Sequence, residues 1–362
     1  MEKLIVHTDC LHFNGYKPCK PHKEHGVHCE DCLYYEKSGP NILIIKFAAA
    51  GEVIRNTPLL YAIKEKHPNA KIFWITEYPQ LVPEKQVYKV LEYNLASIIL
   101  LKDIEFDMIY QLDKDLKACA LANTINAKVK KGFTQKDGVI LPFDDDANHK
   151  FRTGIFDDLH KQNTKHYIEE IFEICGFKFN NQRYILPEFE EPKVSIDKTK
   201  KVVALNTGVG EPWKTRLYSE KNWITLAKKL KSSGYEVIIV GGPEEDEKNK
   251  KIAQESNTKY FGLFPYKEYI GLLNMTDIIV TCVTFAFHVG VGLNKKIVLL
   301  NNIFNPVEFY MYGNGVILEP DLPCKMCYKA KFDERCPVYN CMDLIHPNKI
   351  FEALQQLDSG MK

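Results

Sequence analysis

Residues 201–240, KVVALNTGVGEPWKTRLYSEKNWITLAKKLKSSGYEVIIV, contain the pattern that decides the fold. Their first six residues form a short apolar run, 219–234 has helical periodicity, and 235–240 is a second apolar run. Ser219 is a suitable N-cap for that helix, and Gly234 is a suitable end. Short continuous apolar runs are typical of strands buried on both faces of a parallel sheet. The stretch therefore predicts a strand, a helix and a parallel strand.

The same alternation recurs before and after this stretch. Two further groups of segments have it: strand 42–47, helix 52–67 and strand 71–76; and strand 277–281, helix 284–293 and strand 296–300. We therefore expect an α/β protein with two Rossmann-like halves.

Composition divides the chain into four segments. They are a Cys/His-rich leader (1–40), a first Rossmann-like domain (41–188), a second one (189–323), and a Cys-rich tail with a terminal helix (324–362). The stretch PEFEEPKVSIDKTKK, 187–201, is rich in charge and proline, which is typical of a linker. A length of 362 residues also agrees with two domains.

Charge and hydropathy narrow the classes of function. Lys and Arg total 48 against 47 Asp and Glu, so no global positive field favours nucleic acid. The longest apolar runs fall far short of the roughly 20 residues of a membrane helix. The N-terminus, MEKLIVHTDCLHF, has no secretory core. We expect a cytoplasmic protein, with peripheral attachment to the inner face of the cytoplasmic membrane as an alternative.

The first strand-to-helix turn, KFAAAGEVIRNTP at 46–58, lies where open parallel sheets bind ligands. Gly51 is expected to allow a tight turn there. The turn has no G-x-G-x-x-G, which argues against a nicotinamide or flavin dinucleotide site. Glu52 either complements the helix dipole, worth about 0.3–1 kcal/mol, or serves as a general base. The motif leaves both open.

The second turn, 206–223, follows a strand with Gly208 and Gly210 and then supplies Lys214 and Arg216. Small residues let backbone N–H groups approach an anion, and the two basic residues neutralise phosphate charge. The turn therefore resembles a diphosphate site. The alternative is an ordinary solvated loop.

A third turn, TCVTFAFHVGVGL at 281–293, places Thr284 and His288 four residues apart, on one helical face. The helix N-terminal amides and a hydroxyl could bind a nucleotide diphosphate. His288 alternatively is a core histidine bonded to a carbonyl.

Residues 41 to 345 resemble glycosyltransferase family 9, the heptosyltransferases that build bacterial lipopolysaccharide cores and related surface or protein glycans. The resemblance is carried by four stretches: ILIIKFAAAGEVIRNTPLLYAIKEKHPNA (42–70), ALNTGVGEPWKTRLYSEKNW (204–223), EVIIVGGPEED (236–246) and TDIIVTCVTFAFHVGVGLNKKIVLL (276–300). It implies a GT-B fold, in which two Rossmann-like domains flank a cleft.

The resemblance also implies an activity: inverting transfer, without a catalytic metal, of a sugar from a nucleoside-diphosphate donor, often ADP-heptose. The implied acceptor is a hydroxyl of a lipopolysaccharide core or other surface glycan. A protein O-heptosyltransferase, a non-catalytic nucleotide-sugar-binding protein and a nucleotide-sugar epimerase are the alternatives. The oligomeric state is not predicted.

Site residues follow from the same resemblance. Glu52 falls where the family usually has an aspartate base, and Lys214 matches a lysine that stabilises the leaving diphosphate. The implied donor-binding residues are Thr207, Gly208, Gly210, Lys214, Arg216, Gly242, Thr284 and His288. At the donor helix the family commonly has Asp-Ser-Gly-x-x-His, whereas this chain has Val283, Thr284 and Phe285 before the histidine.

Eight of the eleven cysteines form two sets with similar spacing. The leader set is Cys10, Cys19, Cys29 and Cys32, and the tail set is Cys324, Cys327, Cys336 and Cys341. Each contains one Cys-x-x-Cys pair, which favours a four-thiolate structural metal site. Zinc is expected, with iron or an iron–sulfur cluster as alternatives. Reduced unliganded thiols and disulfides remain open, and Cys119 and Cys175 are expected in the core.

Overall fold

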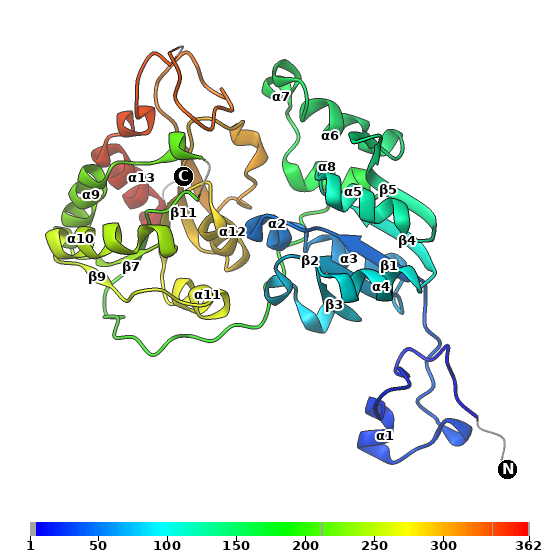
Figure 1. Cartoon of the computed structure of the whole chain (residues 1–362). Helices are drawn as coiled ribbons and strands as arrows, with labels where there is room; N and C mark the ends of the chain where they lie inside the picture. The colour runs from blue at the N-terminus through cyan, green and yellow to red at the C-terminus, as the bar shows by residue number, and fades with distance from the viewer. Residues whose placement is uncertain (1–4, 211–212, 335, 361–362) are drawn as a thin grey trace. The chain divides into compact units, whose positions relative to one another are not determined.

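The computed structural model describes residues 5–210, 213–334 and 336–360, and the described chain forms two compact units (Figure 1). The first unit takes in the chain up to Phe47, then Leu59–Pro79 and Glu84–Ala147. The second takes in Ala48–Pro58, Gln80–Pro83 and the chain from Asn148 onward. The short segment that carries Glu52 therefore belongs to the second unit.

The first unit is built on a six-stranded sheet with the order β3-β2-β1-β4-β5-β6. Its strands are β1 (Asn41–Ile45), β2 (Lys71–Thr76), β3 (Lys89–Glu92), β4 (Phe106–Gln111), β5 (Ala127–Lys136) and β6 (Val139–Pro142). All pairs are parallel except β5 with β6. The α-helices in the described part of this unit are α1 (Lys20–His25), α3 (Leu59–Lys66), α4 (Leu95–Lys102) and α5 (Leu116–Thr124).

The second unit is built on an all-parallel sheet with the order β12-β11-β10-β7-β8-β9. Its strands are β7 (Val202–Asn206), β8 (Glu236–Val240), β9 (Lys259–Tyr260), β10 (Ile278–Cys282), β11 (Lys296–Leu300) and β12 (Gly315–Leu318). Counted from its own first strand, each sheet has the order 3-2-1-4-5-6 of dinucleotide-binding folds. The expected pair of Rossmann-like halves is confirmed.

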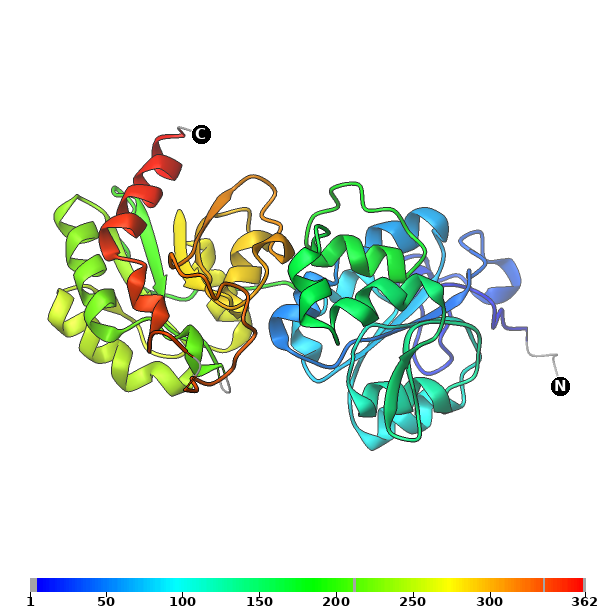
Figure 2. The same ribbon diagram turned by 90° about the horizontal axis from the view of Figure 1, so that it is seen from above.

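The helices of the second unit include one element from the N-terminal part of the chain. They are α2 (Ala50–Arg55), α6 (Asn148–Thr153), α7 (Asp157–Gln162), α8 (Tyr167–Ile174), α9 (Glu220–Ser232), α10 (Asp246–Ser256), α11 (Tyr266–Asn274), α12 (Phe285–Gly292) and α13 (Pro347–Ser359). Short 3₁₀ turns η5 (Lys214–Arg216), η6 (Pro243–Glu245), η7 (Pro306–Glu308) and η8 (Cys341–Leu344) lie between them. The terminal helix α13 packs against α9 in the same unit (Figure 2).

Helix α9 illustrates why the sequence folds as it does locally. The Ser219 side chain accepts a hydrogen bond from the Asn222 N–H, which caps the helix as predicted. Trp223, Leu226 and Leu230 follow at helical spacing and are fully buried. Burial of apolar surface contributes roughly 25 cal/mol per Å², so these side chains stabilise the packing of the helix on the sheet.

The single helix predicted at 52–67 is wrong, because α2 ends at Arg55 and α3 begins at Leu59. Pro58 has no N–H to donate and disfavours helical backbone at the preceding residue. The Thr57 hydroxyl donates to the Ile54 carbonyl at 2.7 Å and so satisfies a carbonyl at the helix end. The break separates a short α2 from α3, and the two helices belong to different units.

Within the described ranges, none of the helices has both the length and the apolar character needed to cross a bilayer.

Candidate active site

The topological switch point of the second sheet lies between β7 and β10, the neighbours at which strand order reverses. Asn206, at the end of β7, donates from Nδ2 to the hydroxyls of Thr281 at 3.1 Å and Thr284 at 3.2 Å. The Tyr269 hydroxyl donates to Asn206 Oδ1 at 2.9 Å. The two strand ends are thus joined by a buried polar network, and Thr284 lies at the N-cap of α12.

The loop after β7 brings the predicted residues Thr207, Gly208 and Gly210 to this switch point. Thr207 is fully buried and its hydroxyl bonds Asn249 Oδ1 at 2.5 Å. Gly210 has φ +66°, a backbone conformation that favours glycine. The loop is therefore held close to the ends of the neighbouring strands.

The loop after β8 supplies an acidic side chain that sequence reasoning missed. Glu245 Oε2 accepts from the Gly242 N–H at 3.0 Å. A Cβ on Gly208 would lie 2.7 Å from the same oxygen, so a larger residue there would force the Glu245 carboxylate to shift. Lys248, also missed, donates to the Thr207 carbonyl at 3.1 Å. Both charged residues thus lie beside the predicted diphosphate turn.

Lys214 and Arg216 lie on η5 and differ in exposure. Lys214 is exposed, whereas Arg216 is buried. The Arg216 guanidinium donates to the Val283 carbonyl and, at 2.6 Å, to the Val209 carbonyl. Burial lowers the pKa of Arg216 to about 10. Arg216 therefore ties the β7 loop to the residue before Thr284, while Lys214 is the more accessible cation.

Glu52 and His288 come together through the packing of α2 on α12. A Cβ on Gly51 would lie 2.4 Å from His288 Cδ2, so glycine allows this close approach. The expected tight turn at Gly51 is wrong, since the residue lies inside α2. The Glu52 side chain is 25% exposed, and it lies in the first turn of the helix as predicted.

His288 is buried and neutral. Burial and the nearby charge of Arg55 lower the pKa of His288 to about 3, although Glu52 acts in the opposite direction. Its Nδ1 atom has no hydrogen-bond partner among the described residues. The expected bond from a core histidine to a carbonyl is therefore not made by Nδ1.

Arg55 is the largest omission from the sequence-based site. It is buried, and its Nη1 donates to Glu52 Oε1 at 2.9 Å. Its Nη2 donates to the Glu308 carbonyl at 2.6 Å, and the guanidinium lies 3.7 Å from the centre of the Tyr167 ring. Burial disfavours the charged form, but the negative charge of Glu52 and the smaller contributions of Tyr184, Tyr167 and Glu308 together outweigh it and raise the pKa of Arg55 overall.

The first unit has a corresponding switch point between β1 and β4. There, the Asp113 carboxylate accepts from Lys46 Nζ and from the Phe47 N–H. Both side chains of this ion pair are buried. The buried Lys46–Asp113 ion pair thus lies at the switch point of the first unit. The switch point of the second unit instead has the threonine hydroxyls and the glycine-containing loop.

Within the described residues, the cysteines form no disulfide bonds. Cys119 and Cys175 are buried as predicted. Across residues 5–210, 213–334 and 336–360, no three His, Cys, Asp or Glu side chains are arranged to hold a metal ion. Burial raises the pKa of Cys341, and the charges of Cys327 and Cys324 add to the effect. The tail thiols therefore interact electrostatically, but the predicted metal sites have no coordination geometry here.

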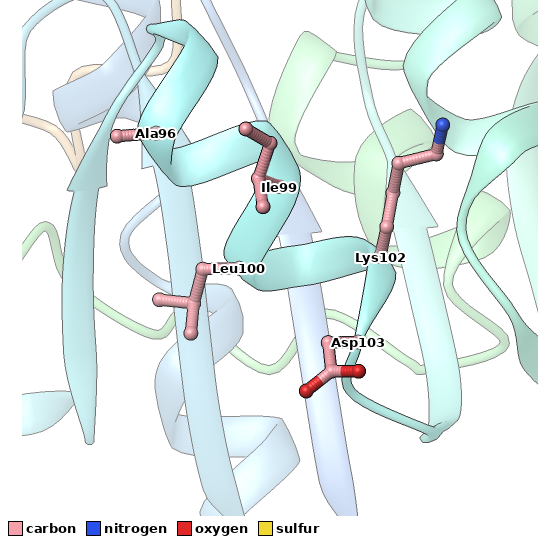
Figure 3. A pocket seen from close by; sticks show the side chains of 5 residues that line it. All are labelled: Ala96, Ile99, Leu100, Lys102 and Asp103. Carbon is pink, nitrogen blue, oxygen red and sulfur yellow. The ribbon is translucent and has the colours of Figure 1, made fainter.

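A pocket in the first unit is formed by helix α4 and the residue that follows it. Figure 3 shows it on α4, lined by Ala96, Ile99, Leu100, Lys102 and Asp103. None of the predicted site residues lines it.

Comparisons with known proteins identify the family of the chain. Residues 98–334 match the family model described as glycosyltransferase family 9 (heptosyltransferase). A comparison with curated protein sequences finds no match.

Three solved structures illustrate the fold. A glycosyl transferase family 9 protein from Veillonella parvula is 17% identical, with a TM-score of 0.64, over 88% of this chain and 97% of that one. The E. coli ADP-heptose LPS heptosyltransferase II is 16% identical, with a TM-score of 0.61, over 88% and 98%. The iron-containing dodecameric glycosyltransferase TibC from E. coli is 13% identical, with a TM-score of 0.55, over 92% and 84%.

The two parallel Rossmann-like sheets thus have the GT-B fold of these structures. The family model spans well over half of the chain. The chain belongs to glycosyltransferase family 9 (heptosyltransferase), and it is a glycosyltransferase.

Proposed function

We propose that this enzyme transfers heptose from ADP-heptose to a hydroxyl of a lipopolysaccharide core or another surface glycan, with inversion at the anomeric carbon. The observation that carries the proposal is the packing of α2, which carries Glu52, on α12, which carries His288, within one unit; the Glu52 charge acts on His288. The E. coli structure named as an ADP-heptose LPS heptosyltransferase supports the choice of donor and acceptor class.

In the proposed reaction the diphosphate of the donor binds at the β7/β10 switch point. The backbone of 207–210 and the N-terminus of α12 offer N–H groups to the anion. Lys214 stabilises the negative charge that develops on the leaving diphosphate. Thr284 and Gly242 complete the donor contacts, and Arg216 holds the loops that carry them.

Glu52 takes the proton from the acceptor hydroxyl while that oxygen attacks the anomeric carbon. The bond from the anomeric carbon to the diphosphate oxygen breaks on the opposite face, which inverts the configuration. The products are the glycoside and ADP. No step requires a metal ion.

Transfer from ADP-heptose to a panel of acceptors tests the proposal. Replacement of a positioned base typically costs 10²–10⁴ in rate, so Glu52→Gln should lower kcat by about 10³ without loss of ADP binding. The matched control is Glu65→Gln, at an exposed position of α3, which should be unchanged. Full activity of Glu52→Gln would refute the catalytic role of this residue.

The same experiment separates the alternatives. A protein O-heptosyltransferase would modify a polypeptide and not a glycan. A nucleotide-sugar-binding protein would bind ADP-heptose without turnover, and an epimerase would release an altered sugar nucleotide without forming a glycoside.

We also propose a structural metal at the cysteine sets, zinc by preference or iron. Its support is the spacing of each set, with one Cys-x-x-Cys pair among four cysteines. Elemental analysis of purified protein should find close to one metal ion for each cysteine set that binds metal. Cys324→Ser should lose the metal ion of the tail set. Cys119→Ser, in the core, should keep the metal. Less than about 0.2 equivalents per chain would contradict the proposal, because structural thiolate sites bind tightly.

A further inference from the structure

We propose that Arg55 is the positioning residue for the base: it orients the Glu52 carboxylate and holds it in its charged form. The inference rests on the proposed function, in which Glu52 accepts the acceptor proton. It extends that function to a residue three positions further along α2.

The contact differs from an ordinary surface pair on a helix. An exposed i,i+3 ion pair contributes only about 0.2–0.5 kcal/mol and does not fix a geometry. Here, the Arg55 side chain is 5% exposed, and its Nη1–Glu52 Oε1 distance is 2.9 Å. A buried guanidinium has few other conformations, so it can hold the Glu52 Oε1 oxygen in place.

The guanidinium is itself fixed from two further sides. Nη2 donates to the Glu308 carbonyl at 2.6 Å, and the Tyr167 ring centre lies 3.7 Å from Cζ. This uses the planar fork and the aromatic stacking that distinguish arginine from lysine. A lysine ammonium at this position could not make both contacts in the same way.

The groups that hold Arg55 are anchored in turn. The Glu308 carboxylate pairs with His160 Nε2 at 2.7 Å, and His160 Nδ1 lies 3.0 Å from the Thr153 carbonyl. Although burial acts the other way, the His160 hydrogen bond and nearby positive charges lower the pKa of Glu308. Glu308 lies in the turn after β11, so Arg55 links the base to the donor sheet of the same unit.

Several titratable groups interact electrostatically with Glu52. Arg55 shares its helix, Tyr167 comes from α8, and His288 comes from α12, with Tyr184 nearby. Burial raises the pKa of both tyrosines, and the His288 ring is neutral above pH 4 or so, given its pKa of about 3. Arg55 is therefore a cation that faces Glu52 across the working pH range.

Two substitutions separate the orientation from the charge. Arg55→Met removes both, and Arg55→Lys keeps the charge but not the fork. The matched control is Arg183→Lys. Arg183 is exposed, donates to Asn294 Oδ1 at 2.6 Å and lies 4.5 Å from the Tyr312 ring centre. Steady-state kcat and KM, the pH profile of kcat/KM, ADP binding and thermal melting are measured for all three.

We expect kcat to fall by about 10²-fold in both Arg55 variants, because the Glu52 carboxylate would be misplaced and a shift of about 1 Å costs about this much in rate. The acidic limb of kcat/KM should move to higher pH in Arg55→Met and stay near its wild-type position in Arg55→Lys, because an adjacent cation favours the carboxylate. ADP affinity and the Arg183→Lys control should be unchanged.

Wild-type kcat in Arg55→Lys, or an unmoved acidic limb in a folded Arg55→Met, overturns the inference. If Arg55→Met does not fold, the kcat of Arg55→Lys still decides the question. Failure of the proposed function looks different, since Glu52→Gln itself would then be active.

Discussion

The two switch points of this enzyme share a strand order and differ in chemistry. In the first unit, the ends of β1 and β4 are joined by the buried Lys46–Asp113 ion pair. In the second, the ends of β7 and β10 are joined by Asn206 and the hydroxyls of Thr281 and Thr284. The topology marks both positions as ligand sites in open α/β sheets. The side chains at each switch point therefore determine whether it can bind a ligand.

The largest expected effect comes from breaking the ion pair of the first unit. Asp113→Ala leaves a buried lysine without its carboxylate, and removing one partner of a buried pair costs about 3–5 kcal/mol. Urea denaturation should show this loss in the free energy of unfolding. The double variant Lys46→Met/Asp113→Leu should regain most of it, because apolar replacements of a buried pair are often neutral.

ADP affinity of the folded double variant sharpens the comparison. It should equal that of the wild type if the β1/β4 switch point has a structural role. A large loss of ADP affinity would show that this position also contributes to the donor site.

The next effect concerns the second switch point. Lys214→Ala should weaken ADP binding by about tenfold or more, since a hydrogen bond to a charged group contributes about 1.5–3 kcal/mol. Isothermal titration with ADP provides the measurement. Lys228→Ala, on the exposed side of α9, is the control and should bind ADP normally. Equal affinities in the two variants would remove Lys214 from the donor site.

A smaller effect is expected where α2 approaches α12. Gly51→Ala forces a methyl group towards His288 Cδ2, and overpacking of this kind costs about 1–3 kcal/mol. Thermal melting should show the loss together with reduced transfer. The pair Gly51→Ala/His288→Ala restores the space and should recover stability but not transfer. Unchanged stability of Gly51→Ala alone would mean that the two helices do not pack this closely.

The last effect, comparable in size to that of Gly51→Ala, is a dependence of the free energy of unfolding on pH. His288 has a pKa of about 3 when folded and about 6.5 when unfolded, so the unfolded state binds the extra proton. Its contribution to stability is complete above pH 6.5 and is lost as the pH falls towards 3. Between pH 7 and 4, His288→Asn should lose less free energy of unfolding than the wild type, by an amount on the order of a few kcal/mol. If the free energy of unfolding changed with pH equally in both proteins, the prediction that His288 is buried and neutral would be contradicted.

Much of the fold was predictable because its signals are local. The predicted strands 71–76 and 296–300 coincide with β2 and β11, and the Ser219 cap is observed. The break between α2 and α3 was also encoded, by Pro58, but the apolar periodicity on both sides obscured it. Local signals therefore predict the elements better than their ends.

The site was only partly predictable because its contacts are distant in sequence. Arg55 and Glu308 are 253 positions apart, and neither belongs to a motif that names a role. Glu245 and Lys248 follow the glycines of the β8 turn, a signal that could have suggested them. The role of Gly51 depends on a helix more than two hundred residues away, which no local turn rule describes.

A crystal structure of the enzyme with ADP tests the central claim most directly. The account predicts the diphosphate beside Gly208 and the N-terminus of α12, with the Lys214 ammonium within hydrogen-bond distance of a phosphate oxygen. A diphosphate bound beside Asp113 in the first unit, or no binding of ADP at millimolar concentration, would contradict it.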